Sequence, residues 1–202
     1  MNLRTELPTA ENSSNFNAVA DAVTKAGTTL ENLKAAVAGE TGASAKYAAF
    51  AKAAKEQGFD QLARLWEATS AAEQIHINLE ASLVEVEDPS YTRPTAEAPT
   101  PEAIDLNLIA SANGEIFETS DMYPTFIKKA QEEGHAKAVK VFTRAKLAEA
   151  VHAEKYLEAY NNIDAADDDA YYLCPGCGYI HKGDDFEKCP ICGVPKAKFQ
   201  RF

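Results

Sequence analysis

The sequence predicts a mainly α-helical protein, a four-helix bundle followed by a small cysteine-rich domain. Four stretches of roughly 25 residues have the length and composition of helices, and the first is rich in Ala, Lys and Glu and free of proline. One segment with four prolines separates the second stretch from the third. All four cysteines lie between residues 174 and 192. Helices and cysteines therefore occupy separate parts of the chain.

The composition of the 202-residue chain limits its partners. With 31 acidic against 20 basic residues the net charge is −11, which argues against nucleic acid because phosphate binding needs clustered Lys and Arg. Some of the carboxylates are expected to bind metal instead. The sequence has no apolar run of about 18 residues for a membrane span, and residues 1–16 lack the apolar core of a secretory signal. We expect a reducing cytoplasm, where paired C-x-x-C motifs indicate metal ligands before disulfides.

Local signals bound the first two helices. Residues 1–28 are polar and irregular, and we expect them to form an N-terminal extension. Thr28 and Glu31 form a capping box that opens the first helix, which ends near Glu56. Gly58 is the expected break, and the second helix runs from about 59 to 86.

A long connection separates this helical pair from the next. It covers about residues 88–102 and contains four prolines: Pro89, Pro94, Pro99 and Pro101. The third helix runs from about 102 to 134, with a kink or turn expected at Pro124, and the fourth from about 135 to 160. Four helices with one long crossover are typical of ferritin-like bundles. We expect such a bundle at residues 29–165 and, after an acidic linker, a cysteine domain at 168–202.

Two Glu-x-x-His motifs repeat at a spacing of 76 residues, Glu73 with His76 and Glu149 with His152. Residues three apart share one face of a helix, so each motif presents a carboxylate and an imidazole together. A single motif of this kind is usually a solvated surface pair. Two of them in matching halves indicate two walls of one internal site.

Each half also carries a glutamate on its first helix. Glu40 and Glu115 both follow a glycine and stand 75 positions apart, while Glu118 adds a fifth carboxylate where the first half has Gly42. Five buried carboxylates would be costly without cations. Glutamates and histidines in this pattern suit a pair of iron or manganese ions.

Two tyrosines occupy matching places near these glutamates. Tyr47 lies seven residues after Glu40, hence on the same helix face, and Tyr123 occupies the corresponding place in the other half. We expect each phenol to donate a hydrogen bond to a ligand carboxylate. The alternative is an ordinary tyrosine of the apolar core.

The cysteines form two C-x-x-C motifs in the same Cys-Pro-x-Cys-Gly context, Cys174 with Cys177 and Cys189 with Cys192. Four thiolates suit Zn(II) or a single iron, and their spacing alone does not separate a zinc ribbon from a rubredoxin-type iron site. A domain of about 35 residues buries little core, so metal would supply folding energy in either case. An iron redox site in the bundle needs an electron source, and this favours iron among the cysteines.

Together these motifs resemble the rubrerythrin family. The resemblance covers nearly the whole chain and rests on the stretches LENLKAAVAGETGA, DLNLIASANGEIFETSDMYP and CGYIHKGDDFEKCPIC. It implies that Glu73 and Glu149 bridge two irons and that Glu40 is a terminal ligand of the first. It also implies that Glu115 and His152 bind the second iron, and that the four cysteines hold a third.

The resemblance further implies that Glu118 and His76 compete for the first iron according to its oxidation state. Charge balance supplies a reason, because the five carboxylates carry −5 against +4 for two ferrous ions in a low-dielectric core. Exchanging Glu118 for neutral His76 lowers the ligand charge to −4. The freed carboxylate could then take or give protons.

By resemblance, the expected activity is the reduction of hydrogen peroxide to water in the cytoplasm, as the terminal component of an NADH peroxidase that protects against oxidative stress. Electrons would come from NADH through a separate flavin reductase, with or without a rubredoxin. The resemblance also implies a head-to-tail homodimer, which would bring the cysteine iron near the partner's metal pair, and the sequence leaves open whether that iron serves its own bundle or the partner's. Iron oxidation or storage, a zinc-stabilised module without activity, and a substrate oxygenase are the alternatives.

Overall fold

The structure, a computed structural model, describes residues 20–163 and 168–202. Most of the expected N-terminal extension and part of the acidic linker therefore lie outside the described residues. The helices are α2 (Thr29–Glu56), α3 (Asp60–Glu87), α4 (Ile104–Phe117), α5 (Tyr123–Glu132) and α6 (Ala136–Asn161), with the π-helix η2 (Glu118–Met122) between α4 and α5. None of these described helices combines the length and apolarity needed to cross a membrane.

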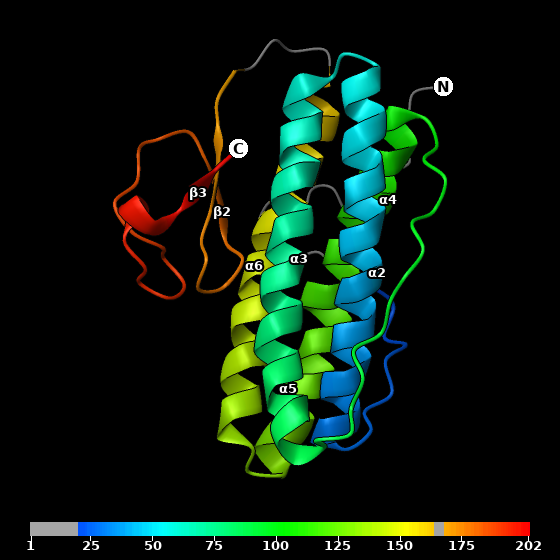
Figure 1. Cartoon of the computed structure of the whole chain (residues 1–202), viewed down its shortest axis with the longest axis vertical. Coiled ribbons are helices and arrows are strands. Elements are labelled where there is room, and N and C mark those ends of the chain that lie inside the picture. Colours follow the sequence, from blue (N-terminus) through cyan, green and yellow to red (C-terminus); the bar gives the residue numbers. More distant parts are fainter. Residues whose placement is uncertain (1–19, 164–167) are drawn as a thin grey trace.

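The connection between α3 and α4 runs along the outside of the bundle from one end to the other (Figure 1). As a result α4 runs in the same direction as α3, whereas α2 and α6 run the opposite way. This is the predicted ferritin-like bundle with its long crossover, and the prediction of the fold class is confirmed.

Capping and glycine turns end the helices where the sequence predicts. Thr28 Oγ1 accepts a hydrogen bond from the backbone N–H of Glu31, and Glu31 Oε2 accepts one from the N–H of Thr28 at 2.7 Å. Gly58 after α2 and Gly134 after α5 have φ of 81° and 70°, a left-handed conformation that glycine adopts at little cost. Both helical hairpins therefore close by the same kind of turn.

The third helix departs from an α-helix just before Pro124. Residues 118–122 form the π-helix η2, and Pro124 stands in the first turn of α5. Proline has no N–H to donate to the preceding turn, so the chain changes its hydrogen-bond pattern ahead of it. The predicted break is present, but its form is a π-helix rather than a simple kink.

The two largest apolar clusters of the bundle lie one on each side of a polar layer. One contains Tyr47, Trp66, Leu108 and Tyr156, and the other contains Leu33, Tyr123 and Phe142 among further residues. On α2, α3, α4 and α6 alike, the predicted metal ligands lie between the residues of the two clusters along the helix. The site is therefore enclosed by apolar packing at both ends.

The small domain has a three-stranded antiparallel sheet in the order β2-β1-β3, built from β1 (Tyr171–Leu173), β2 (Ile180–Lys182) and β3 (Gln200–Arg201), with a short 3₁₀ helix η3 (Lys196–Lys198). Strands β1 and β2 pack against α3 and α6 of the same chain (Figure 1). The sequence left open whether this domain lies near its own bundle or near a partner's, and in this structure it lies against its own bundle. Tyr171, Leu173 and Ile180 of the small domain belong to the same buried apolar cluster as Trp66 of the bundle, which accounts for this packing. Gln61 Nε2 also donates to the carbonyl oxygen of Asp169 at 2.9 Å.

Candidate metal centres

Four glutamates, one from each of α2, α3, α4 and α6, meet inside the bundle with no solvent exposure: Glu40, Glu73, Glu115 and Glu149. With the histidines they form two overlapping groups whose ligand atoms lie within 4.8 Å of one another. One group contains Glu40 and His76, and the other contains Glu115 and His152. Glu73 and Glu149 belong to both groups, which is the place that bridging ligands occupy.

His76 faces carboxylates with one ring nitrogen and a backbone carbonyl with the other. Its Nδ1 lies 2.8 Å from Glu149 Oε1 and 3.0 Å from Glu73 Oε2. Its Nε2 lies 3.1 Å from the carbonyl oxygen of Cys177. A carbonyl oxygen only accepts hydrogen bonds, so Nε2 carries the ring proton and the Nδ1 lone pair points at the carboxylates. This tautomer leaves Nδ1 available to a metal ion.

His152 repeats this geometry in the second group. Its Nδ1 lies 2.8 Å from Glu149 Oε2 and 3.4 Å from Glu115 Oε2, and its Nε2 lies 2.9 Å from the carbonyl oxygen of Gly178. Burial alone would lower the pKa of His152, yet the Glu149 and Glu115 carboxylates raise it well above its usual value. Each ring therefore has hydrogen-bond acceptors beside both of its nitrogens. A metal cation bound at Nδ1 would neutralise the carboxylates there, so the ring would not need a second proton.

The carboxylates are crowded as well as buried. Burial, followed by repulsion from Glu73 and Glu149, raises the pKa of Glu115 to about 8. Among the described residues several carboxylate oxygens have no hydrogen-bond partner, namely Glu40 Oε2, Glu73 Oε1, Glu115 Oε2 and both oxygens of Glu149. Such oxygens are costly in an apolar interior unless cations bind them. Carboxylate and imidazole donors together suit iron, so these residues fit the expected metal pair.

Glu118 stands beside the two groups rather than inside either of them. It is the first residue of η2 and is 8% exposed, and its Oε2 has no partner within the described ranges. Burial and then repulsion from Glu115 raise its pKa. Of the two residues expected to compete for the first metal position, His76 occupies the group in this structure.

Both predicted tyrosines donate to glutamates of the site, and each bond crosses from one half to the other. The Tyr47 hydroxyl donates to Glu115 Oε1, and the Tyr123 hydroxyl donates to Glu40 Oε1. Tyr47 thus bonds a glutamate of the second half, not Glu40 on its own helix. The bonds tie α2 to α4 and α5 through the ligand carboxylates.

One buried glutamate at the site was not predicted. Glu80 on α3 has no solvent exposure, and its Oε1 lies within hydrogen-bond distance of the Tyr123 hydroxyl oxygen, at 2.9 Å. A signal for it exists in the sequence, because Glu80 follows Glu73 by two helical turns and therefore shares its face.

The cysteine centre is made by two equivalent turns. Gly178 and Gly193 have φ of 76° and 78°, and their N–H groups donate to the carbonyls of Cys174 and Cys189 at 3.1 and 3.0 Å. The four thiols are free, and their sulfur atoms lie within 4.8 Å of one another: Cys174, Cys177, Cys189 and Cys192. The closest sulfur pairs are 3.4 and 3.5 Å apart. Four sulfurs at about 2.3 Å from one tetrahedral metal ion would be roughly 3.8 Å apart, so this cluster fits such an ion.

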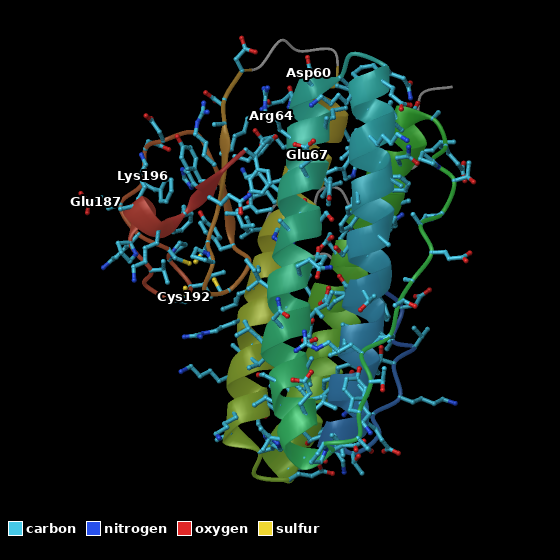
Figure 2. All side chains as sticks on the ribbon, in the orientation of Figure 1. Asp60, Arg64, Glu67, Glu187, Cys192 and Lys196 are labelled. Atoms are coloured by element: carbon cyan, nitrogen blue, oxygen red, sulfur yellow. The ribbon has the colours of Figure 1, made fainter. Side chains whose placement is uncertain are left out.

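The four thiols influence one another's titration. Hydrogen bonds from Cys174 and Cys177 lower the pKa of Cys189, while hydrogen bonds with Cys174 and Cys189 raise the pKa of Cys177. His181 instead bonds Tyr179 and Asp185 and is outside the ligand group. In Figure 2 Cys192 lies at the lower end of the small domain, while Glu187 and Lys196 lie at its outer edge.

The backbone at Cys177 and Gly178 joins the two centres. The carbonyl of Cys177 accepts the Nε2 proton of His76, and the carbonyl of Gly178, in the next peptide unit, accepts the Nε2 proton of His152. Gly178 fits closely there, because a Cβ at this position would lie 2.4 Å from His76 Nε2. The turn that carries a thiolate therefore sits directly on both histidines.

Comparison with known proteins gives consistent matches over both parts of the chain. A family model described as rubrerythrin matches residues 31–160, and one described as the rubredoxin-like domain of rubrerythrin matches 172–200. Nigerythrin of Nitratidesulfovibrio vulgaris (strain Hildenborough) is 67% identical over 202 residues, all of both chains. Rubrerythrin of the same organism is 34% identical over 184 residues, covering 87% of this chain and 95% of the relative.

A solved structure of nigerythrin, described as the fully reduced and all-ferrous state, has a TM-score of 0.90 and 68% identity and covers 96% of each chain. A partially reduced state of nigerythrin gives the same TM-score. These findings confirm the family that the sequence resembles.

Proposed function

The chain belongs to the rubrerythrin family, and from this premise we propose that it is a non-haem iron peroxidase that reduces hydrogen peroxide to water. As an iron-based redox protein of this family it binds two irons in the bundle and one among the four cysteines. When bound, the bundle pair supplies the two electrons that reduction of one peroxide consumes, and the cysteine iron passes electrons one at a time.

We assign the ligands from the two groups in the bundle. Glu73 and Glu149 would bridge the irons. Glu40 and His76 would complete the first position, and Glu115 and His152 the second. The distances between the ligand atoms of each group support this division. The four cysteines would bind the third iron. Tyr47 and Tyr123 would orient the carboxylates of Glu115 and Glu40 through their hydrogen bonds.

Glu118 and His76 have the catalytic role in this proposal. Glu118 lies next to the site with an unpartnered oxygen, and η2 gives its backbone a conformation that can change by a small shift in helical register. We propose that Glu118 replaces His76 at the first position when the pair is oxidised. When displaced, its carboxylate takes or gives the protons that convert peroxide to water.

The observation that carries the proposal is the double contact of the Cys177 and Gly178 carbonyls with His76 and His152. It supports electron delivery from the cysteine iron to the bundle pair over a short hydrogen-bonded path. The electrons would come from NADH through a separate reductase and a rubredoxin. Because four free thiols persist as ligands in a reducing compartment, we propose that the protein acts in the cytoplasm.

A head-to-tail homodimer also belongs to the proposal. The cysteine domain touches α3 and α6 of its own chain here. The same surfaces would serve a domain exchanged between two copies, since identical elements can be exchanged between protomers. A mixed dimer would distinguish a domain that serves its own bundle from an exchanged one. One chain would lack the bundle iron, the other would lack the cysteine iron, and the two would be cross-linked. Only an exchanged domain would restore activity in this dimer.

A coupled assay tests the function itself. Iron-loaded protein, given NADH, a flavin reductase and a rubredoxin, should consume peroxide and NADH in a ratio of one to one. Growth of a mineral core during aerobic loading with ferrous iron, without peroxide turnover, would identify an iron-storage protein and contradict the proposal.

A further inference from the structure

We infer that Glu80 is a buried carboxylic acid that holds a proton for the Glu40 side of the bundle site and acts there through Tyr123. Glu80 is in this sense a positioning residue, since its hydrogen bond reaches the ligand set only by way of the phenol. It lies four residues beyond His76 on α3 and belongs to neither group of ligand atoms.

The number of protons in the hydrogen-bond chain leads to this assignment. The Tyr123 oxygen bonds two carboxyl groups, Glu40 Oε1 and Glu80 Oε1, the second at 2.9 Å. A phenol has one proton and can donate it to one acceptor only. One of the two contacts therefore needs a proton on the carboxyl group. Glu40 is assigned to a metal ion as a carboxylate, so the proton belongs to Glu80.

The surroundings of Glu80 favour the same state. Its side chain has no solvent exposure, and its Oε2 has no hydrogen-bond partner among the described residues. A buried oxygen without a hydrogen-bond partner costs far more free energy when the carboxyl group is an anion than when it is a neutral acid. Burial, the largest influence, raises the pKa of Glu80 to about 8, against the attraction of His76 and the hydrogen bond with Tyr123. The chain of donors then runs from Glu80 to Tyr123 to Glu40.

The internal repeat shows that this arrangement exists on one side only. At the spacing of 76 residues that relates the two Glu-x-x-His motifs, Glu80 corresponds to Tyr156. Tyr156 is buried and packs its ring 5.5 Å from the ring of Tyr47, the phenol that serves Glu115. The Glu115 side therefore has a second phenol where the Glu40 side has an acid.

The asymmetry has a consequence for the proposed reaction, and only this consequence rests on the proposed function. Reduction of one peroxide to two waters consumes two electrons and two protons. The Glu80 proton can pass to the Tyr123 oxygen as Tyr123 gives its own proton to the Glu40 carboxylate, and no bond between heavy atoms changes. Each turnover therefore needs one proton from bulk solvent to restore the acid form of Glu80. The acid thus stores one of the two protons on the side where Glu118 and His76 are expected to exchange.

Infrared spectroscopy of the iron-loaded protein tests the protonation directly. Wild type should show the carbonyl stretch of a buried carboxylic acid, shifted in deuterated water, and Glu80→Gln should lose it. The matched control is Glu67→Gln, which changes an exposed glutamate on the outer face of the same helix (Figure 2) and should keep the band. Should Glu80→Gln fail to fold, Tyr123→Phe should shift the band because the acid loses its acceptor. A spectrum in which neither variant changes this band would overturn the assignment.

The midpoint potential of the bundle pair gives a second readout. Replacing a neutral acid by a neutral amide leaves the local charge unchanged, so Glu80→Gln should keep the wild-type potential. A raised potential would mean that Glu80 carries a negative charge, and would refute the inference. Peroxide turnover of Glu80→Gln should fall about tenfold, less than the ~100-fold expected for a donor that touches the substrate. If wild type shows the band but turns over no peroxide, the proposed function fails and the assignment of Glu80 stands.

Discussion

The bundle site and the cysteine site hold their ligands within the same small distance but are built in different ways. The bundle ligands come from four helices and are spread from residue 40 to residue 152, between two apolar clusters. The cysteines come from two turns within residues 174–192, in a domain with three short strands. Apolar packing creates the first site before a metal binds, whereas the metal itself must hold the second together. The difference teaches that one protein can place redox iron in a preformed site in one region and in another rely on redox iron for folding as well.

The largest expected effect comes from removing one cysteine ligand. Cys177→Ser should unfold the small domain, because a structural metal can supply on the order of 10 kcal/mol of folding free energy. The bundle should keep its helicity and its iron. Limited proteolysis and circular dichroism would show selective cleavage after residue 163 with the helical signal retained. Cooperative loss of both parts in this variant would show that the comparison is wrong.

Gly178→Ala tests the contact between the two regions. The change combines strain at φ 76° with a Cβ that would lie 2.4 Å from His76 Nε2, so the turn should move off the histidines. We expect the cysteine iron and the bundle iron to remain bound and electron transfer between them to slow, by about tenfold or more in rapid-mixing measurements.

The equivalent turn supplies the matched control. Gly193 has φ of 78°, but a Cβ there would meet nothing within 4 Å. Gly193→Ala should therefore carry similar backbone strain without the loss of electron transfer. Equal slowing in both alanine variants would assign the effect to strain in the cysteine turns and remove the support for the path through the histidines.

Glu118→Ala tests the catalytic role within the bundle. Turnover should fall by about 100-fold, the lower end of what a positioned proton donor contributes, while both histidines and four glutamates still bind iron. Measurement of iron content beside the peroxide assay separates lost chemistry from lost metal. Unchanged turnover with intact iron would show that the fifth carboxylate is not needed.

The smallest expected effect is on the stability of the bundle in acid, through an ion pair between α2 and the end of α3. Lys34 on α2 bonds Asp88 at the end of α3 at 2.7 Å, and this bond and that from Ser90 lower the pKa of Asp88 to about 2. A carboxyl whose folded pKa is depressed stabilises the fold above its unfolded pKa near 4 and loses this contribution as pH falls toward 2. Asp88→Asn should therefore flatten the acid side of a plot of thermal midpoint against pH, slightly because the pair is exposed. A variant with the same acid dependence as wild type would rule this contribution out.

The sequence predicts the fold and most of the bundle site because both rest on local spacing. Glu73 and His76 are three residues apart, and the repeat at 76 positions identifies Glu149 and His152 without any knowledge of how helices pack. The boundaries at Thr28 and Gly58 likewise depend on neighbouring residues.

The features that were not predicted depend on contacts between distant segments. The role of Glu80 follows from Tyr123, which lies 43 positions away in the sequence. The docking of the cysteine turn rests on His76 and Cys177, 101 positions apart. The π-helix has a local cause at Pro124, but proline allows several responses, and the helices packed around it select one.

A rapid-mixing experiment tests most directly the claim that peroxide reacts in the bundle and draws electrons from the cysteine iron. The anaerobically reduced protein would be mixed with excess peroxide while the red absorbance of the ferric cysteine site is followed. We predict fast reddening in wild type and much slower reddening in Glu149→Ala, which removes a carboxylate shared by both ligand groups. Equal rates in the two proteins would show that peroxide oxidises the cysteine iron without the bundle and would contradict the account.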